Sequence, residues 1–248
     1  MRLAVLNDIH GNLPALEAVL DEVRDAEVDR IVVGGDVVLG PMPREALQRL
    51  LAIDVPVDFL YGNCEVAVLD HLAGRIPGSV PEPFRPLVRW NAEQLGPAER
   101  NVIASWPMTV RHDVDPIGRV LFCHATPRNE NEIFTERTPI DRLIPLFEPL
   151  DVALVVCGHT HMPFDRMVGN TRVVNAGSVG MPFGAPGADW VLIGPDVEAR
   201  HTRYDLEAAA ARIRRSGYPA AEEFAATSVL HPPTADAMLA AYAQRELT

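Results

Sequence analysis

The stretch LAVLNDIHGN, residues 3–12, decides the fold. Its four apolar residues, Leu3–Leu6, read as a buried strand, and a polar turn follows at once. A helical pattern comes next, with Asn12 or Asn7 available as the N-cap, Pro14 in the first turn and apolar residues at helical spacing. A strand that leads into a helix through a short turn opens a βαβ unit, so we predict an α/β fold.

The turn after this strand carries two side chains of metal-ligand type, Asp8 and His10. The pattern recurs after four further apolar runs, which we predict as strands over Ile31–Val33, Phe59–Tyr61, Val120–Phe122 and Ala153–Cys157. Together the five turns supply seven residues of this type: Asp8, His10, Asp36, Asn63, His124, His159 and His161. Strand ends on one edge of a sheet lie close together, so the pattern predicts a site for two divalent ions.

Two of the clusters, Asp8 with His10 and His159 with His161, are i, i+2 pairs. In an extended segment such side chains point the same way, so each pair is expected to serve two neighbouring ions. A lone acid at a strand end is more often a turn or helix cap. Two imidazoles on a buried edge are costly, however, unless metal or hydrogen bonds satisfy them. The remaining histidines are interpreted as ordinary structural or surface residues: His71, His112, His201 and His231.

Length and composition limit the class of protein. The chain has 248 residues and is 48% hydrophobic, enough for one sizeable core, and we predict a single domain over residues 1–248. With no run of 18 apolar residues and no leader-like start, we expect a cytoplasmic protein without a membrane segment. The three cysteines, Cys64, Cys123 and Cys157, lack the spacing of a disulfide framework and fit a reducing compartment.

Charge and residue usage exclude several function classes. The formal net charge of −12 disfavours a general nucleic-acid surface, which relies on basic residues to neutralise phosphates. All 22 basic residues are arginine, so the chain has no lysine for a Schiff base or a Walker-type phosphate loop. A small phosphorylated ligand remains compatible with this composition.

Two regions differ from the strand and helix alternation of the N-terminal part. Residues 65–108 read as two or three helices broken by prolines, an insertion that we predict to cap the site. Strand patterns return after it, around one helix over Ile140–Phe147. Residues 205–248 read as a helical tail, with helices over Leu206–Arg215 and Ala220–Gln244 that we expect to pack outside the core.

Six short motifs run through the chain in a fixed order. They are Asp8-Ile9-His10-Gly11-Asn12, Gly35-Asp36 with Gly40, Gly62-Asn63-Cys64-Glu65, Cys123-His124-Ala125, Gly158-His159-Thr160-His161 and Asn175-Ala176-Gly177-Ser178-Val179-Gly180. This series resembles the calcineurin-like metallophosphoesterases, especially their small bacterial and archaeal phosphodiesterase-like branch. The resemblance implies a four-layer αββα sandwich of two mixed β-sheets with a helical cap insertion.

The resemblance also implies how the ligands divide between two divalent ions. One ion would be held by Asp8, His10 and His161, and the other by Asn63, His124 and His159. Asp36 would bridge them, and we count Asp36 and Asn63 as the catalytic residues. Nitrogen and oxygen ligands of these types suit Mn²⁺, Fe, Zn²⁺ or Ni²⁺.

The chain departs from this family at position 64. Most members carry a histidine there, next to an acid, where it contacts phosphate and helps to protonate the leaving group, whereas this chain has Cys64. General acid assistance is worth about 10²- to 10⁴-fold, so good leaving groups should be favoured. We expect Asn63, Cys64 and Arg128 to contact the substrate, with a surface ion pair as the alternative for Arg128. Glu65 either orients a ligand or is a solvated turn acid, and Asn175 is expected to fix the site backbone.

The sequence therefore predicts a metal-dependent phosphoesterase, a phosphodiesterase more than a monoesterase, that attacks a small phosphoester with a hydroxide activated by two metals. A non-catalytic protein-interaction module is the alternative, because the resemblance includes an adaptor subunit of eukaryotic membrane-sorting coats with a degenerate site. A thiol-based phosphatase that uses Cys64 is disfavoured, since no phosphate-cradling loop with a following arginine accompanies the cysteine.

Overall fold

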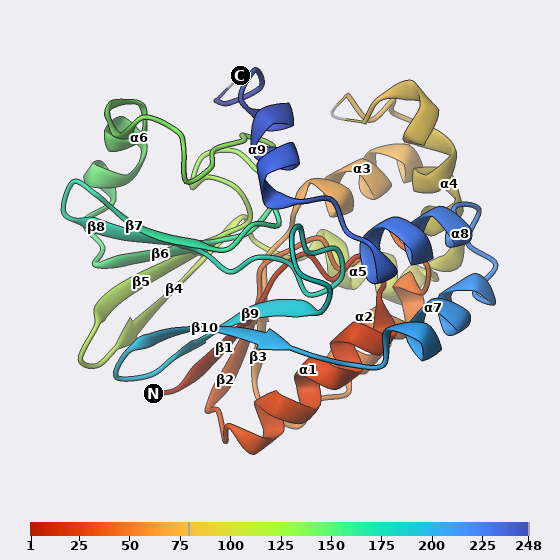
Figure 1. The fold of residues 1–248 in the computed structure, drawn as a ribbon, viewed down its shortest axis with the longest axis horizontal. Helices are drawn as coiled ribbons and strands as arrows, with labels where there is room; N and C mark the ends of the chain where they lie inside the picture. Colours follow the sequence, from red (N-terminus) through yellow and green to blue (C-terminus); the bar gives the residue numbers. More distant parts are fainter. Residues whose placement is uncertain (79, 248) are drawn as a thin grey trace.

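The structure is a computed structural model that describes residues 1–78 and 80–247. Two five-stranded sheets pack face to face, with helices on both outer sides (Figure 1). The first sheet has the order β10-β9-β1-β2-β3, with bounds Val197–Thr202, Ala188–Ile193, Leu3–Leu6, Arg30–Val33 and Val57–Phe59. The second has the order β4-β5-β6-β8-β7, with bounds Thr109–Val114, Gly118–Cys123, Leu154–Cys157, Thr171–Asn175 and Phe164–Val168.

Both sheets are mixed. In the first, β1, β2 and β3 are parallel, and β9 runs antiparallel to β1 and to β10. In the second, β5, β6 and β8 are parallel, and the edge strands β4 and β7 are antiparallel to their neighbours. Each sheet therefore presents the carboxyl ends of three parallel strands, the edge at which α/β folds commonly place ligand sites.

Nine α-helices complete the described part of the chain. They are α1 Leu13–Asp25, α2 Pro43–Leu51, α3 Asn63–Leu72, α4 Arg85–Gln94, α5 Pro97–Ala104, α6 Ile140–Phe147, α7 Leu206–Arg214, α8 Ala221–Phe224 and α9 Ala235–Tyr242. Short 3₁₀ turns η1 Glu82–Phe84 and η2 Glu148–Leu150 and a π-helical segment η3 Ala225–Leu230 lie between them. None of the described helices is long and apolar enough to span a membrane.

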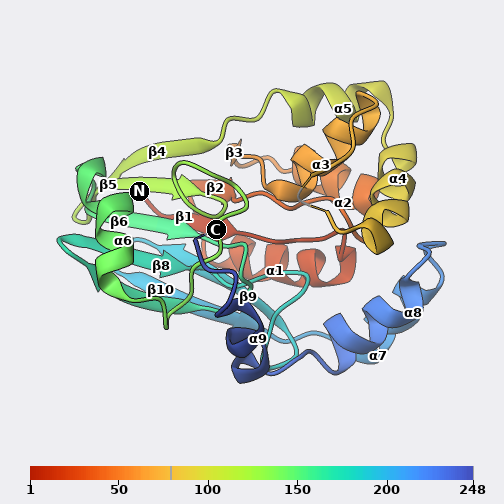
Figure 2. The ribbon, with the colours of Figure 1, turned by 90° about the horizontal axis from the view of Figure 1, so that it is seen from above.

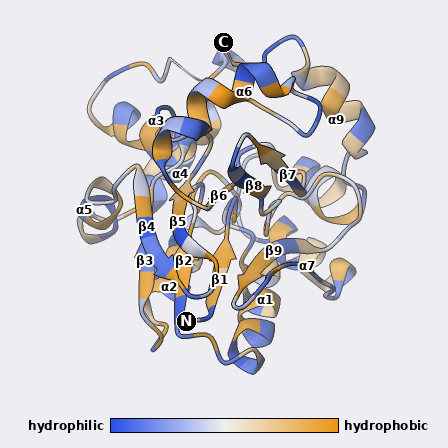
Figure 3. Ribbon diagram, turned by 90° about the vertical axis from the view of Figure 1, so that its left-hand side faces the viewer, coloured by the Kyte–Doolittle hydropathy of each residue, from blue (hydrophilic) through white to orange (hydrophobic). Residues whose placement is uncertain are grey.

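The hydrophobic core is divided among three layers. The inward faces of the two sheets meet in a cluster that includes Val5, Phe122 and Val156. Helix α6 covers the outer face of the second sheet through Leu143 and Phe147, and a larger cluster joins the first sheet to α1, α2 and neighbouring helices. The strands appear as apolar ribbons between these helices in Figure 3. This arrangement confirms the predicted αββα sandwich.

Helix α1 begins as the sequence predicts. The Asn12 side chain accepts a hydrogen bond from the Ala15 amide at 3.3 Å, and Pro14 occupies the first turn. An N-cap acceptor satisfies one of the amides that a helix start leaves free. Asn12 also donates to the Gly180 carbonyl at 2.9 Å. The same residue therefore starts the helix and fixes a loop of the candidate site.

Two element predictions are wrong in their bounds. Strand β3 ends at Phe59, two residues earlier than predicted, because Asn63 already opens α3 and residues 60–62 turn the chain. The helix predicted over Ala220–Gln244 is broken into α8, η3 and α9. The break at residues 231–234 contains Pro232 and Pro233, and prolines cannot donate the backbone hydrogen bonds that would continue the helix.

The tail does not pack outside the core, contrary to the prediction. Ala210, Ile213, Phe224 and Val229 are buried in the same cluster as α1 and the first sheet. Helices α7 and α8 of the tail lie at the same end of the molecule as the helices of the insertion (Figure 2). The insertion is helical as predicted, with α3, α4 and α5, but it encloses the candidate site together with the tail.

Candidate metal centre

Turns after five strands bring the seven predicted ligand residues into one cluster, to which both sheets contribute. Asp8 and His10 follow β1, Asp36 follows β2, and Asn63 is the first residue of α3. The second sheet supplies the histidines that follow β5 and β6: His124, His159 and His161. Five of the seven are buried, and Asn63 and His159 are partly exposed. The cluster therefore combines desolvated ligand atoms with an opening on one side.

The distances divide the cluster into two groups around Asp36. In the first group, His161 Nε2 lies 3.2 Å from both Asp8 Oδ1 and His10 Nε2. In the second, His124 Nε2 lies 3.0 Å from Asn63 Oδ1, and the rings of His124 and His159 are 5.0 Å apart.

Asp36 lies between these groups. Its Oδ2 atom is 3.8 Å from His10 Nε2 and 3.5 Å from His124 Nε2. One carboxylate therefore reaches a histidine of each group. Two groups of donors with a carboxylate between them are what two neighbouring cations would require.

Backbone carbonyls fix the orientation of two histidines. His124 Nδ1 donates to the Gly34 carbonyl at 2.9 Å, and His161 Nδ1 donates to the Met181 carbonyl at 2.8 Å. A ring whose Nδ1 carries the donated hydrogen presents Nε2 as a lone pair, and both Nε2 atoms face the cluster. This use of the second ring nitrogen is typical of histidines that bind metal in proteins.

One buried oxygen in the cluster has no hydrogen bond. Asp8 is fully buried, and its Oδ1 atom has no hydrogen-bond partner, although Oδ2 accepts from the His159 amide at 2.8 Å. A buried carboxylate oxygen without a partner is costly, so native structures rarely leave one unsatisfied. A cation among the ring nitrogens would satisfy Asp8 Oδ1. The residues present therefore fit divalent metal ions held by oxygen and nitrogen ligands.

The ionisation of the cluster suits a cation. Burial, reinforced by neighbouring histidines, lowers the pKa of His10 and of His159 to about 4. Burial alone would raise the pKa of Asp8, but the surrounding histidines hold it well below its usual range. For His124, burial is outweighed by the carboxylates of Asp36 and Asp8, which raise its pKa. Neutral His10 and His159 beside an ionised Asp8 are the protonation states that metal binding needs.

The ligand turns have strained backbones, which corrects the prediction of extended i, i+2 pairs. Asp8, His10, His159 and His161 all have positive φ, between 47° and 67°. Non-glycine residues rarely adopt this region, and such outliers concentrate at functional sites. The pairs thus reach neighbouring positions through left-handed turns, not through the alternation of a strand.

Glycines let the Asp36 turn approach the Asn63 turn. Gly35 has φ +88°, and a Cβ there would lie 2.5 Å from the Gly62 amide nitrogen. A Cβ at Gly62 would lie 2.2 Å from Asp36 Oδ1. Only glycine at both places permits this contact between the two loops.

Glu65 anchors the Asp36 loop and is not a solvated turn acid. It is fully buried, and its carboxylate accepts hydrogen bonds from the amides of Asp36, Val37, Val38 and Gly62 at 2.8 to 3.2 Å. Burial and the Asp36 charge raise the pKa of Glu65 to about 7, against the effect of these donors. Glu65 lies at the third position of α3, where an acid that reaches back to the amide before the helix is a recognisable sequence pattern.

Cys64 donates to the central carboxylate. Its Sγ lies 3.0 Å from Asp36 Oδ2, and its amide donates to Asp36 Oδ1 at 2.8 Å. Burial and the carboxylates of Asp36 and Glu65 raise the pKa of the Cys64 thiol well above its ordinary value. The reactive form of cysteine is the thiolate, so this thiol is unsuited to nucleophilic attack. Cys123 and Cys157 are free and buried, as predicted.

The remaining predicted residues have clear positions. Arg128 is paired with Glu132 through contacts of 2.6 to 3.0 Å, and its side chain is 60% exposed, so it adopts the ion pair that was the alternative interpretation. Asn175 donates to the Gly158 carbonyl at 2.6 Å and accepts from the Gly177 amide at 2.8 Å, which confirms that it fixes the site backbone.

The other histidines lie outside the ligand cluster. His112 is paired with Asp58, and His201 with Asp189, each at 2.7 Å. The backbone carbonyl acceptors of the cluster, at Gly34, Asn131 and Met181, were not predicted. A carbonyl is common to every residue, so no side-chain pattern could have identified them.

A cavity of ≈ 310 Å³ opens beside the cluster, shares His10 and Asn63 with it and is also lined by Cys64. The insertion supplies one wall, from Val80 to Leu87, and the tail supplies another, from Tyr218 to Ser228. The insertion, which was predicted to cap the site, therefore supplies only one of these two walls. Sequence patterns gave no indication that the C-terminal tail returns to the site.

Three similarities to known proteins agree with this geometry. Phosphodiesterase YfcE of Escherichia coli strain K12 is 26% identical over 207 residues, which cover 79% of this chain and 89% of that protein. A solved metallophosphoesterase of Sphaerobacter thermophilus is 27% identical with a TM-score of 0.72, covering 92% and 99% of the two chains. The hypothetical protein PH1004 of Pyrococcus horikoshii OT3 shares the fold, with a TM-score of 0.79 at 21% identity and coverage of 94% and 99%.

The family model described as the calcineurin-like phosphoesterase superfamily domain matches residues 1–194. The match contains all seven cluster residues and ends before α7, so the tail lies beyond it. Because this family model matches most of the chain, the protein belongs to the calcineurin-like phosphoesterase superfamily.

Proposed function

We propose that this protein is a metal-dependent phosphoesterase that hydrolyses small phosphodiesters in preference to monoesters. The observation that carries the proposal is the convergence of seven oxygen and nitrogen donors, two of them rings oriented by backbone carbonyls, around a buried carboxylate oxygen without a partner. Membership in the superfamily supports phosphoester hydrolysis. The name of the relative YfcE, a phosphodiesterase, supports the preference for diesters.

We further propose that the centre binds two divalent ions, Mn²⁺, Fe, Zn²⁺ or Ni²⁺. Asp8, His10 and His161 would hold one, and Asn63, His124 and His159 the other, a division supported by the two groups of short distances. Asp36 would contact both, since its Oδ2 atom lies within 4 Å of a histidine of each group.

When bound, such ions activate water for attack and offset the charge of the phosphoryl group. The chain's own residues prepare this step. The Gly34 and Met181 carbonyls hold the two imidazoles in the ligating orientation, and the Cys64 thiol and amide hold the Asp36 carboxylate. No imidazole stands at position 64 to protonate a departing alkoxide, so turnover should depend on the basicity of the leaving group.

Asn63 and Cys64 border both the cluster and the adjacent cavity, which supports a role for them in contacting substrate. A phosphate contact by Arg128 would require its pair with Glu132 to open. The net charge of −12 supports a small phosphoester over a nucleic acid as the substrate, and the three free thiols support a cytoplasmic location.

Metal analysis combined with hydrolysis of p-nitrophenyl esters tests this function. Wild-type protein loaded with Mn²⁺ should cleave bis(p-nitrophenyl) phosphate faster than p-nitrophenyl phosphate, and chelation should abolish both activities. Asp36→Asn should lose metal and at least about 10²-fold in turnover while remaining folded, because the central negative charge is removed.

His201→Ala is the matched control, since His201 pairs with Asp189 away from the cluster, and it should retain wild-type metal content and rate. Near-normal turnover with two metals in Asp36→Asn would contradict the role of Asp36. Full metal occupancy in the wild type without hydrolysis of any ester would instead favour the interaction module.

A further inference from the structure

The lining of the cavity beside the metal centre is mainly apolar. Away from the ligand cluster its polar side chains are those of Tyr218, Glu223, Thr227 and Ser228, all from the tail. The polar groups nearest the centre are His10, Asn63 and Cys64. Its far walls are mainly aliphatic and aromatic carbon, the composition typical of a small-molecule site with a few polar anchors.

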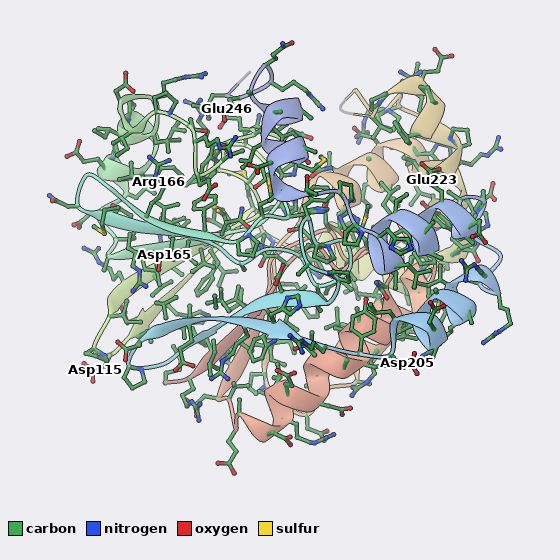
Figure 4. The ribbon with its side chains drawn as sticks, viewed as in Figure 1. Asp115, Asp165, Arg166, Asp205, Glu223 and Glu246 are labelled. Atoms are coloured by element: carbon green, nitrogen blue, oxygen red, sulfur yellow. The ribbon has the colours of Figure 1, made fainter. Side chains whose placement is uncertain are left out.

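All basic residues of this chain are arginine, so only an arginine could place a basic side chain in the cavity lining. No arginine is among the described residues of the lining. Among the described lining residues outside the metal centre, the one charged side chain is that of Glu223, which is exposed on α8 and labelled in Figure 4. A second phosphate or a carboxylate in this cavity would therefore meet a like charge and no cation.

The aromatic part of the wall is already packed. Tyr218 and Phe224 are 7% and 6% exposed, and their rings contact edge to face at 6.3 Å. Trp90 of the insertion lies against Tyr218 at 5.2 Å. The insertion and the tail thus brace each other, and the cavity is preformed, which limits the ordering cost of filling it.

We propose, on the basis of the proposed function, that this cavity receives an uncharged, apolar organic group of the phosphoester whose phosphoryl group lies at the metal centre. The substrate class is then aryl or compact alkyl phosphoesters. Nucleoside polyphosphates and other esters with a second anionic group are disfavoured, because the described lining offers such a group an exposed carboxylate and no arginine. The tail, which lies outside the matched family domain, supplies one wall of this cavity, and the insertion supplies another.

Binding of phosphonates by calorimetry tests this inference without relying on turnover or on which ester group leaves. The Mn²⁺-loaded protein is titrated with inorganic phosphate, methylphosphonate, phenylphosphonate and 4-carboxyphenylphosphonate. Phenylphosphonate should bind about tenfold or more tightly than methylphosphonate, the gain expected from burying most of an aromatic ring. Its heat-capacity change should also be more negative, the mark of apolar burial. The added carboxylate should remove the gain.

A charge introduced at the rim gives a gain-of-function test in a protein that stays folded. Thr227 is exposed and lines the cavity, so Thr227→Arg should restore tight binding of 4-carboxyphenylphosphonate, measured as its affinity relative to that of inorganic phosphate in the same variant. Asn101→Arg, at an exposed position of α5 outside the cavity lining, makes the same charge change of one unit and should restore nothing.

The failure of this inference is distinguishable from the failure of the proposed function. Equal affinity for the phenyl and methyl ligands, in a protein that binds phosphate and hydrolyses esters, would overturn the apolar site alone. An equal response of Thr227→Arg and Asn101→Arg would do the same. A protein that binds neither phosphate nor any phosphonate and hydrolyses no ester would overturn the proposed function itself.

Discussion

At the scale of single residues, the candidate centre depends on partners as much as on ligands. Asp36 is held by the thiol and amide of Cys64, and its loop is held by the buried carboxylate of Glu65. Cys64 therefore lies where the resemblance implies a general acid, but it donates to the carboxylate of a candidate metal ligand. It can orient that carboxylate, but its raised pKa makes it a poor acid for a leaving group at neutral pH.

Cys64 supplies a prediction about leaving groups. With no imidazole to protonate the alkoxide, the rate should fall steeply as the pKa of the leaving alcohol rises, so aryl diesters should react far faster than alkyl diesters. Cys64→His should flatten this dependence, and Cys64→Ser should change turnover little because a hydroxyl can still donate to Asp36. The measurement is kcat across a series of substituted phenyl diesters. Loss of turnover by several orders of magnitude in Cys64→Ser, at full metal content, would revive the thiol nucleophile.

The buried histidines supply a prediction about pH and stability without metal. Burial lowers the pKa of His10 and His159 to about 4, whereas an unfolded histidine titrates near 6.5. Between those values the unfolded chain binds protons that the native protein does not, so the free energy of unfolding falls as pH falls. Glu65, with its pKa raised to about 7, acts in the opposite direction over part of this range.

Comparison with a double variant removes the Glu65 contribution. In chelator, wild-type protein should lose about 2 to 4 kcal/mol more stability between pH 7.5 and pH 5 than His10→Gln/His159→Gln, as urea denaturation would measure. Parallel pH dependence in the two proteins would show that these histidines titrate normally in the native state.

The ligand residues could be predicted from the sequence because each has a chemically distinctive side chain at a strand end. Their geometry could not. Positive φ at Asp8 and His10 is imposed by hydrogen bonds to the Gly35 and Asp36 carbonyls from a loop that lies far along the chain. The environment of Glu65 likewise depends on the Asp36 loop, which folds over it. The burial of Glu65 therefore could not be predicted from its neighbours in the sequence.

At the scale of elements, the alternation of β1, α1 and β2 followed from short apolar runs and a capped amphipathic helix. The packing of the tail could not be predicted in this way. Alanine-rich helices have weak hydrophobic periodicity, and small residues are compatible with either surface or core. In the structure, close packing against α1 uses that small size, and Ala210 is fully buried. Phe224 and Tyr218 are the tail's buried aromatic side chains in this cluster, and Phe224, which has no hydroxyl group, is the simpler probe of the tail.

Phe224→Ala should destabilise the whole protein. Removing a side chain that is 6% exposed leaves a cavity in the core, at a cost of about 3 to 5 kcal/mol. Phe84→Ala is the matched control, since Phe84 lines the same cavity but is 52% exposed, and it should cost under about 1 kcal/mol. Denaturation followed by tryptophan fluorescence measures both. An equally small effect of the two substitutions would show that the tail is not part of the core.

At the scale of the whole molecule, the candidate centre joins the two sheets. Turns of the first sheet supply Asp8, His10 and Asp36, and turns of the second supply three histidines. The tail's side chains share a core with the first sheet, so we propose that residues 1–248 fold as one domain. The layered architecture could be predicted from the motif series. The side that the tail covers is determined by tertiary packing and could not be predicted.

The proposed function depends most on the binding of two divalent ions at this centre. Anomalous diffraction from crystals grown with Mn²⁺ measures the number and positions of those ions directly. We expect two peaks, one among Asp8, His10 and His161 and one among Asn63, His124 and His159, with the Asp36 carboxylate between them. His161→Ala should remove the first peak and His159→Ala the second. A single peak, no peak, or loss of both peaks to the same degree in each variant would contradict the proposed two-ion centre.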